Sequence, residues 1–116
     1  MELIKRDGYK GLVVLADPVL NNPRVPELGA RLGLATLYLS RGSVAAGGLM
    51  SYGPDFNDIY KRAGGYVAKV LNGAKPSDLP VEQPTKFSFV INLNAAAALG
   101  ITLPQQLLSV ADELIQ

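Results

Sequence analysis

The chain has 116 residues, enough for one domain with a single hydrophobic core. Hydrophobic residues make up 48% of the sequence and charged residues 18%, and the formal net charge is +1. This is a globular composition, and its charge gives no reason to expect a nucleic-acid partner. Because cysteine and histidine are both absent, disulfides, thiolate nucleophiles and a Ser-His-Asp triad are excluded.

The first half of the chain alternates between strand and helix signals. Three short apolar stretches predict strands, at residues 12–16, 34–39 and 48–52. The first of these has no polar alternation, which predicts a strand buried on both faces, as in a parallel sheet. Asn22 and Pro23 predict the start of a helix that ends at Gly33, and residues 41–46 predict a short helix. This β-α-β-α-β order predicts an α/β fold with a parallel sheet and right-handed crossovers.

The next segment carries the clearest helical pattern. Asp55 is placed to cap its start, and Gly73 is placed to end it. Apolar residues recur at the spacing of one helical face: Phe56, Ile59, Tyr60, Ala63, Val67, Val70 and Leu71. The sequence therefore predicts an amphipathic helix over most of residues 55–72.

The C-terminal part begins with a proline-rich run, AKPSDLPVEQPTK, which predicts an extended surface segment. Residues 86–91 alternate and predict a strand with unequal faces at a sheet edge. Asn92 is placed to cap a short helix that Gly100 ends. Pro104 opens a last predicted helix, and its apolar face comprises Leu107, Leu108, Ala111, Leu114 and Ile115.

Polar side chains lie at the carboxyl ends of the three predicted strands of the first half, and ligands of open parallel sheets bind beyond such strand ends. Asp17 follows the first strand, Ser40 and Arg41 follow the second, and Ser51 and Tyr52 are the last residues of the third. Together they suit a small polar or zwitterionic molecule, with Asp17 accepting from an ammonium group and Tyr52 covering an apolar part. Ordinary roles as turn former, helix caps, surface charge and packing group remain open for the same residues.

No carboxylate pair or metal-ligand cluster stands out in the sequence. We therefore expect no catalytic residue, no metal site and no cofactor. A small α/β enzyme remains an alternative, but without histidine and cysteine it would have to rely on aspartate, lysine or tyrosine.

Four motifs in the second half are distinctive together: GGLMSYG, GAKPSDLPVEQPTKF, VIN and LGITLP. With VLADP in the first half, they resemble the C-terminal portion of ABC transporter substrate-binding proteins of the tryptophan- or aromatic-amino-acid-binding type. The resemblance covers nearly the whole chain but only about the last third of such a protein. We therefore expect a truncated chain without an export signal and without the first lobe.

The resemblance implies the type I periplasmic-binding fold, in which two α/β lobes enclose a ligand. The chain, residues 1–116, would be a single unit equivalent to the C-terminal part of that fold. Its expected parts are C-terminal-lobe strands and helices (1–53), a lobe-crossing helix (54–73), a proline-rich linker (74–85), and a returning strand with C-terminal helices (86–116). Gly53 and Pro54 would form a hinge, because glycine tolerates unusual backbone angles and proline restricts its neighbour.

The resemblance also implies a binding function without catalysis. A small amino-acid-like solute would contact Asp17, Ser51 and Tyr52, with Ser40 and Asp55 at the periphery, and Asp17 would meet the solute ammonium group. The partner of the full-length parent would be an ABC permease, and its location periplasmic or otherwise extracytoplasmic.

An alternative is a truncated, self-associating α/β domain that has lost its ligand. We expect a homodimer or a higher oligomer, because the apolar face of the helix over residues 56–71 would otherwise be exposed.

Overall fold

A five-stranded sheet organises the chain. The structure, a computed structural model, describes all residues 1–116 and divides into two units, Met1–Gly53 with Ser88–Gln116 and Pro54–Phe87. The strands are β1 (Gly11–Val13), β2 (Ala35–Tyr38), β3 (Met50–Pro54), β4 (Phe87–Asn92) and β5 (Glu113–Ile115). The helices are α1 (Glu2–Arg6), α2 (Arg24–Arg31), α3 (Arg41–Ala45), α4 (Phe56–Leu71), α5 (Leu93–Ala98) and α6 (Gln105–Ser109), with a 3-10 turn at Pro76–Asp78.

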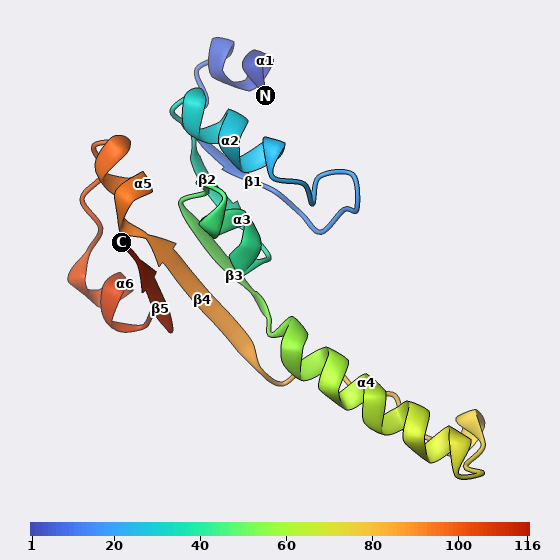
Figure 1. Cartoon of the computed structure of the whole chain (residues 1–116). Coiled ribbons are helices and arrows are strands. Elements are labelled where there is room, and N and C mark those ends of the chain that lie inside the picture. The colour runs from blue at the N-terminus through green and yellow to red at the C-terminus, as the bar shows by residue number, and fades with distance from the viewer. The chain divides into compact units, whose positions relative to one another are not determined.

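The strand order is β1-β2-β3-β4-β5, and β1, β2 and β3 are parallel (Figure 1). β4 returns beside β3 in the opposite direction, with the Asn92 amide donating to the Leu49 carbonyl at 2.8 Å. β5 is parallel to β4. The predicted α/β fold with a parallel β-α-β-α-β unit is thus confirmed, within a sheet that is mixed as a whole.

Helices α2 and α3 cover one face of the sheet. A β-carbon at Gly29 of α2 would lie 3.0 Å from Cγ2 of Thr36 and 3.4 Å from the Tyr38 hydroxyl, so the helix backbone approaches β2 closely. Both crossovers step in the same direction across the sheet, and right-handed crossovers of that kind place their helices on one face. The core on this face includes Val14, Thr36, Tyr38, Val44 and Ser51, all buried.

The other face of β1 is open, so the prediction that the first strand is buried on both faces is wrong. Val13 is 61% exposed, and Leu15, just beyond the strand, is 72% exposed. Neighbouring Leu37 is only half-buried. The reason is topological: both helices that connect β1, β2 and β3 lie on the opposite face, and an unalternating apolar run does not show how many faces are covered.

Two C-terminal predictions are also wrong. The strand predicted at a sheet edge, β4, lies between β3 and β5, and its Val90 and Ile91 are fully buried. The last predicted helix ends at Ser109, and Glu113–Ile115, which contains the last two residues of its predicted apolar face, forms β5. β5 pairs with β4 in the register Val90↔Glu113, a contact between residues far apart in sequence that local periodicity does not reveal.

Predicted helix boundaries agree with the structure where capping residues mark them. The Asn92 side chain accepts a hydrogen bond from the Ala95 amide at 2.9 Å and begins α5. Gly33 and Gly100 have φ values of +66° just beyond the C-caps of α2 and α5, the left-handed region that favours glycine. No helix of the protein is both long enough and apolar enough to cross a lipid bilayer.

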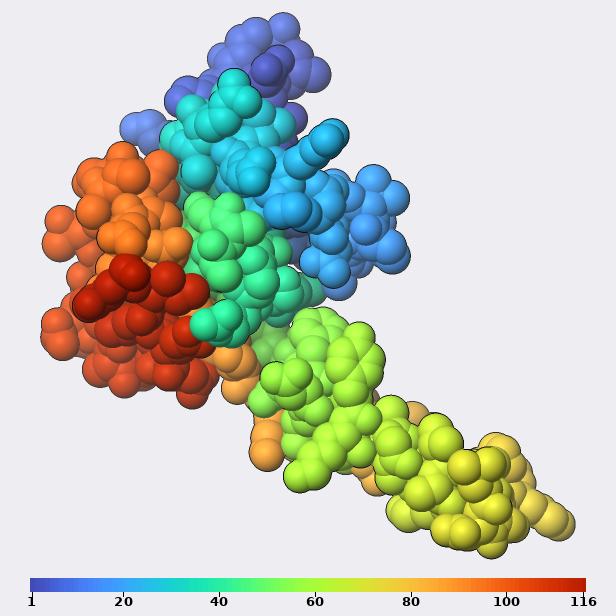
Figure 2. Space-filling view, viewed as in Figure 1, coloured from blue at the N-terminus to red at the C-terminus, as the bar shows by residue number.

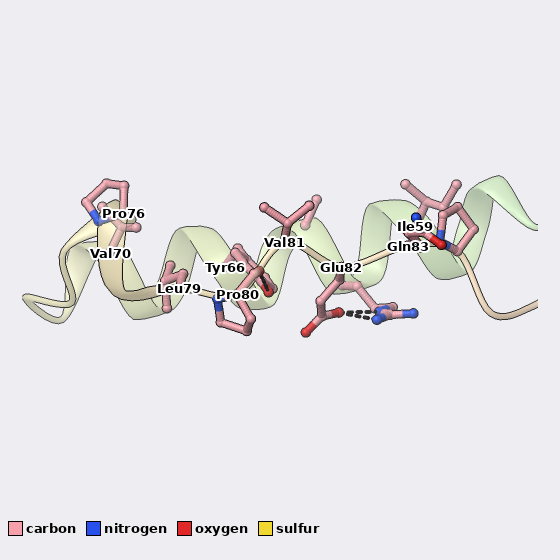
Figure 3. A pocket seen from close by; sticks show the side chains of 12 residues that line it. Ile59, Tyr66, Val70, Pro76, Leu79, Pro80, Val81, Glu82 and Gln83 are labelled. Atoms are coloured by element: carbon pink, nitrogen blue, oxygen red, sulfur yellow. Dashed lines mark hydrogen bonds and ion pairs between the residues drawn. The ribbon is translucent and has the colours of Figure 1, made fainter.

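In the second unit, the predicted amphipathic helix is confirmed as α4. The Asp55 carboxylate caps its start by accepting from the amides of Asn57 at 2.9 Å and Asp58 at 3.3 Å. The proline-rich segment of residues 74–86, here called the strap, runs extended alongside α4 apart from its 3-10 turn (Figure 3). Tyr66 donates a hydrogen bond to the Pro80 carbonyl at 2.5 Å and ties the two together.

Candidate functional site

The carboxyl ends of β1, β2 and β3 meet at one edge of the sheet. Their registers pair Val13 with Leu37 and Tyr38 with Ser51, so the loops after the three strands leave the sheet on the same side. This edge is where open α/β sheets bind ligands. We call it the carboxyl edge.

Asp17 lies four residues beyond the end of β1 and is exposed. Its Oδ1 accepts from the Val19 amide at 2.7 Å, and its carbonyl accepts from the amides of Leu20 and Asn21. Asp17 therefore forms a turn, as one of the two sequence interpretations predicts. A carboxylate has acceptor capacity for further donors, so this turn leaves room for an ammonium contact.

Ser40 begins α3, where its hydroxyl lies 3.1 Å from that of Ser43. Its side chain is half-buried and makes no capping hydrogen bond to the helix backbone. Ser51 is 1% exposed and belongs to the core of β3. Of the two serines, only Ser40 keeps part of its surface accessible at the carboxyl edge.

Tyr52 is 55% exposed, and its ring packs edge-on against Phe89 of β4, with ring centroids 6.2 Å apart. From the sequence, Phe89 is predicted only to lie within the strand over residues 86–91. Its place beside Tyr52 follows from the pairing of β3 with β4, which no local pattern specifies. The two rings give the carboxyl edge an aromatic surface next to the end of β3.

Arg41 does not face a free cleft. Its guanidinium binds both carboxylate oxygens of Glu113, with Nε–Oε2 at 2.7 Å and Nη2–Oε1 at 2.6 Å. The pair joins the start of α3 to β5, and a planar guanidinium suits this bidentate geometry. The Arg41 charge, one of the predicted possible ligand contacts, is therefore already neutralised by Glu113 within the protein.

Gly53 is required by close packing, and its role in the predicted hinge stays a prediction. It is absent from the residues with positive φ, whereas a β-carbon at this position would collide with the carbonyl oxygen of Leu39. Only glycine allows the two strand ends to approach so closely.

Asp55 and Pro54 belong to the second unit. The Asp55 carboxylate is occupied by the α4 amides described above, and its own amide donates to the Lys86 carbonyl at 2.9 Å. Asp55 therefore has a structural role at the start of α4.

A groove of about 460 Å³ lies between α4 and the strap (Figure 3). Its lining is mostly apolar and includes Ile59, Val70, Leu79 and the strap prolines. Arg62 also lines the groove, and its Nε donates to Glu82 at 2.9 Å while its Nη1 donates to Thr85 at 3.2 Å. No sequence pattern pointed to this groove, because it forms only when the strap folds back along α4.

The sequence pattern of a family described as ABC transporter substrate binding protein matches residues 36–115. No curated protein matches the chain. Among solved structures, a conserved domain protein from Vibrio cholerae superposes with a TM-score of 0.86 at 26% identity, over 97% of this chain and 38% of that one. An ABC domain from Streptococcus pneumonia in complex with L-Trp also has a TM-score of 0.86, at 29% identity over 97% of this chain and 39% of that one.

A ligand-free, open substrate binding protein with adhesive properties from Clostridium difficile has a TM-score of 0.60. At 22% identity, over 91% of this chain and 36% of that one, it shows the fold alone. The chain thus spans less than two fifths of the length of each of these structures. Since the family pattern covers most of the sequence, the chain belongs to the ABC transporter substrate binding protein family, whose members bind solutes and are not enzymes.

Proposed function

We propose that this chain supplies one wall of a solute-binding cleft in an ABC import system, and that the solute is a small amino acid or a close analogue. The observation that carries the proposal is the carboxyl edge, where exposed Asp17 follows β1 and where Tyr52, near the end of β3, packs against Phe89 of β4. An α-amino acid has an ammonium group for the aspartate, and an aromatic side chain suits the rings. The relative in complex with L-Trp supports this class of solute.

In this proposal, residues 1–53 and 86–116 belong to the C-terminal lobe, α4 crosses toward the other lobe, and the strap links back. The division of the chain into units at Gly53/Pro54 and at Phe87/Ser88 supports this assignment. Both divisions fall within strands, β3 and β4, so the hinge would consist of two neighbouring crossings. Gly53 and Pro54 form the first of them.

The proposed setting follows from the family. A solute-binding protein hands its solute to a permease, so we infer that an ABC permease is the macromolecular partner of the complete protein. We also infer that the complete protein acts on the extracytoplasmic side of a membrane. Family membership supports both inferences.

The test is an NMR titration of the 116-residue chain with L-tryptophan up to tens of millimolar. Because one wall alone presents few contacts, we expect weak binding, with amide shifts concentrated around Asp17, Tyr52 and Phe89. Absence of shifts over that range, or shifts confined to the groove between α4 and the strap, would contradict the proposed site.

We propose self-association as a second property of this chain. The observation that favours it is that α4 has no buried residue, although apolar side chains occupy much of its surface. Soluble monomers rarely leave a contiguous apolar patch of this kind in water. Light scattering of the isolated chain tests it: a mass of at least twice 12.3 kDa is expected, and a mass of 12.3 kDa would contradict it.

A further inference from the structure

Asp112 binds the backbone of a residue that belongs to the candidate site. Its Oδ2 accepts a hydrogen bond from the Phe89 amide at 2.7 Å, and its own amide donates to the Phe89 carbonyl at 2.8 Å. Phe89 in turn packs edge-on against Tyr52, with ring centroids 6.2 Å apart and an angle of 74° between the ring planes. Asp112 is therefore linked through Phe89 to the aromatic surface at the carboxyl edge.

The Asp112 side chain takes the place of a backbone acceptor. β4 and β5 pair from Val90↔Glu113 onward. In a longer parallel ladder, the Phe89 amide would bond to a backbone carbonyl upstream of Asp112. That part of the chain belongs to the end of α6, where Val110 is the C-cap in a right-handed helical conformation. The strand cannot extend there, so the carboxylate satisfies an amide that would otherwise lack a partner within the sheet.

This hydrogen bond is of the strong kind. An ionised carboxylate makes shorter and stronger hydrogen bonds than a neutral acceptor does, and the distance of 2.7 Å agrees with that. None of the ion pairs of the protein includes Asp112. No cation therefore competes with the Phe89 amide for this carboxylate.

The aromatic surface depends on such support because the core does not enclose its rings. Tyr52 is 55% exposed and Phe89 is half-buried, so packing holds each ring from one side only. An edge-on ring pair is favourable over a narrow range of centroid distances, about 4.5–7 Å. A small shift of the Phe89 backbone would therefore weaken the contact between the two rings.

A second contact anchors β5 itself. Glu113, the residue after Asp112, binds the Arg41 guanidinium through both carboxylate oxygens. Arg41 is the first residue of α3 and follows Ser40, which also lies at the carboxyl edge. Figure 2 shows the C-terminal residues, in red, at the surface beside the green residues of α3. Two adjacent acidic residues thus tie the start of β5 to β4 and to α3, which keeps the Asp112 carboxylate in a fixed place.

We propose that Asp112 is a positioning residue of the solute site: its carboxylate holds Phe89 in place, so that Phe89 and Tyr52 together present an aromatic surface to the solute. Asp112 itself does not touch the solute. The inference rests on the proposed function and deepens it, because it gives the C-terminal segment a role in selecting solutes with an aromatic side chain.

NMR spectra of the 116-residue chain test the positioning without any solute. The Phe89 ring shifts the resonances of the Tyr52 ring protons, and Phe89→Leu defines the resonances that these protons have without it. We expect Asp112→Ala to move them most of the way toward the Phe89→Leu values. Asp112→Asn keeps an oxygen acceptor and should leave them near their wild-type values. Unchanged Tyr52 resonances in Asp112→Ala would overturn the inference.

A control variant separates positioning from a general loss of stability. Val14→Ala removes core contacts just beyond β1, at the opposite edge of the sheet from β5, and should lower stability while leaving the Tyr52 ring protons in place. If Val14→Ala shifts them as Asp112→Ala does, the effect is not specific and the inference is wrong.

The hydrogen bond can also be tested if Asp112→Ala does not fold. Asp112→Asn removes the charge of the acceptor, so the resonance of the Phe89 amide proton should move upfield. An amide resonance that stays at its wild-type position would refute the contact on which the inference depends.

Titration with L-tryptophan tests the role in binding. An aromatic contact of this kind is worth about 2- to 10-fold in affinity, so Asp112→Ala should raise the dissociation constant by that factor, and Asp112→Asn should not. Indole-3-propionate has the same ring without the ammonium group and should lose affinity by the same factor. Unchanged affinity of Asp112→Ala for both ligands would overturn the role in binding.

The two experiments fail in different ways. If the wild-type chain shows no shifts with L-tryptophan, the proposed function is wrong, and the role of Asp112 in solute binding is wrong with it. The Tyr52 ring protons would still show, independently of any solute, whether Asp112 holds Phe89.

Discussion

Arg41 and Glu113 are 72 residues apart and form a bidentate ion pair, with N–O distances of 2.6 and 2.7 Å. The pair joins the start of α3 to β5, the last strand of the sheet. Arg41 therefore has a partner within the fold, and a ligand carboxylate would have to compete with Glu113 for it. The pair also gives β5, only three residues long, an attachment beyond its backbone pairing with β4.

This ion pair predicts a specific acid sensitivity. The hydrogen bond from Arg41 lowers the pKa of the Glu113 carboxyl below its ordinary value. Its stabilising contribution is therefore fully present above the ordinary glutamate pKa and is lost as pH falls through the lowered pKa. We expect Glu113→Gln to lower the melting temperature modestly near pH 7 and to make the melting temperature less sensitive to pH below 4. Circular dichroism melts between pH 3 and 7 measure both effects.

The control is a double variant. Because Arg41→Gln removes the same interaction, adding Glu113→Gln to it should cause little further change in melting temperature at neutral pH. If the two substitutions act additively, the pair does not contribute as a unit.

Gly53→Ala should destabilise the first unit. The new β-carbon would collide with the Leu39 carbonyl. Because the colliding atoms belong to the backbone, only a backbone movement can relieve the collision. Overpacking of this kind costs about 1–3 kcal/mol. Gly65→Ala is the matched control, since its β-carbon meets nothing within 4 Å and alanine should stabilise α4 by up to about 1 kcal/mol. Urea denaturation gives both values, and equal stability of Gly53→Ala and wild type would refute the close-approach argument.

Tyr38→Phe should leave stability unchanged or raise it by up to about 1 kcal/mol. The Tyr38 hydroxyl is buried and makes no hydrogen bond of ordinary geometry, and burial raises its pKa more than the neighbouring Thr36 side chain lowers it. Removing the hydroxyl therefore removes a desolvated polar group and keeps the ring. Tyr38→Ala, which also removes the ring, should cost about 3–5 kcal/mol. A clear loss of stability in Tyr38→Phe would mean that the hydroxyl makes a stabilising contact.

Asn92→Ala should destabilise the sheet by about 1–3 kcal/mol. Asn92 is 7% exposed, caps α5 through Ala95, and donates from Nδ2 to the Val44 carbonyl at 3.2 Å. The substitution removes the cap and leaves that carbonyl without this donor. Exposed Asn94, two residues later in α5, is the matched control, and Asn94→Ala should change little. Similar denaturation midpoints for the two variants would contradict the anchoring role of Asn92.

Local signals in the sequence predicted the parts of the fold that local chemistry decides. Helix α4 was predictable almost residue by residue, because Asp55 caps it, Gly73 follows it and its apolar spacing is regular. Strand β5 was not, because its three residues continue a helical apolar pattern and become a strand only by pairing with β4. Because β5 was not predicted, the sequence also did not predict that β4 lies inside the sheet, between β3 and β5.

The candidate site also combines features that local sequence decides with features that long-range strand pairing decides. The order of strands and turns was enough to predict that Asp17 and Tyr52 lie near the carboxyl ends of strands in one parallel sheet. The burial of Ser51, the engagement of Arg41 by Glu113 and the contact of Tyr52 with Phe89 depend on which strands become neighbours. Such long-range pairings leave no periodic trace in a single sequence.

The central claim, that Asp17 receives the ammonium group of an amino-acid solute, is tested most directly by comparing two ligands. NMR titrations of wild type and Asp17→Asn with L-tryptophan and with indole-3-propionate, which lacks the ammonium group, would give four dissociation constants. Losing one charge-assisted hydrogen bond costs about 1.5–3 kcal/mol. Wild type should therefore bind L-tryptophan more tightly than indole-3-propionate by roughly 10-fold or more. Asp17→Asn should lose that preference. Equal preference for L-tryptophan in the two proteins would contradict the account.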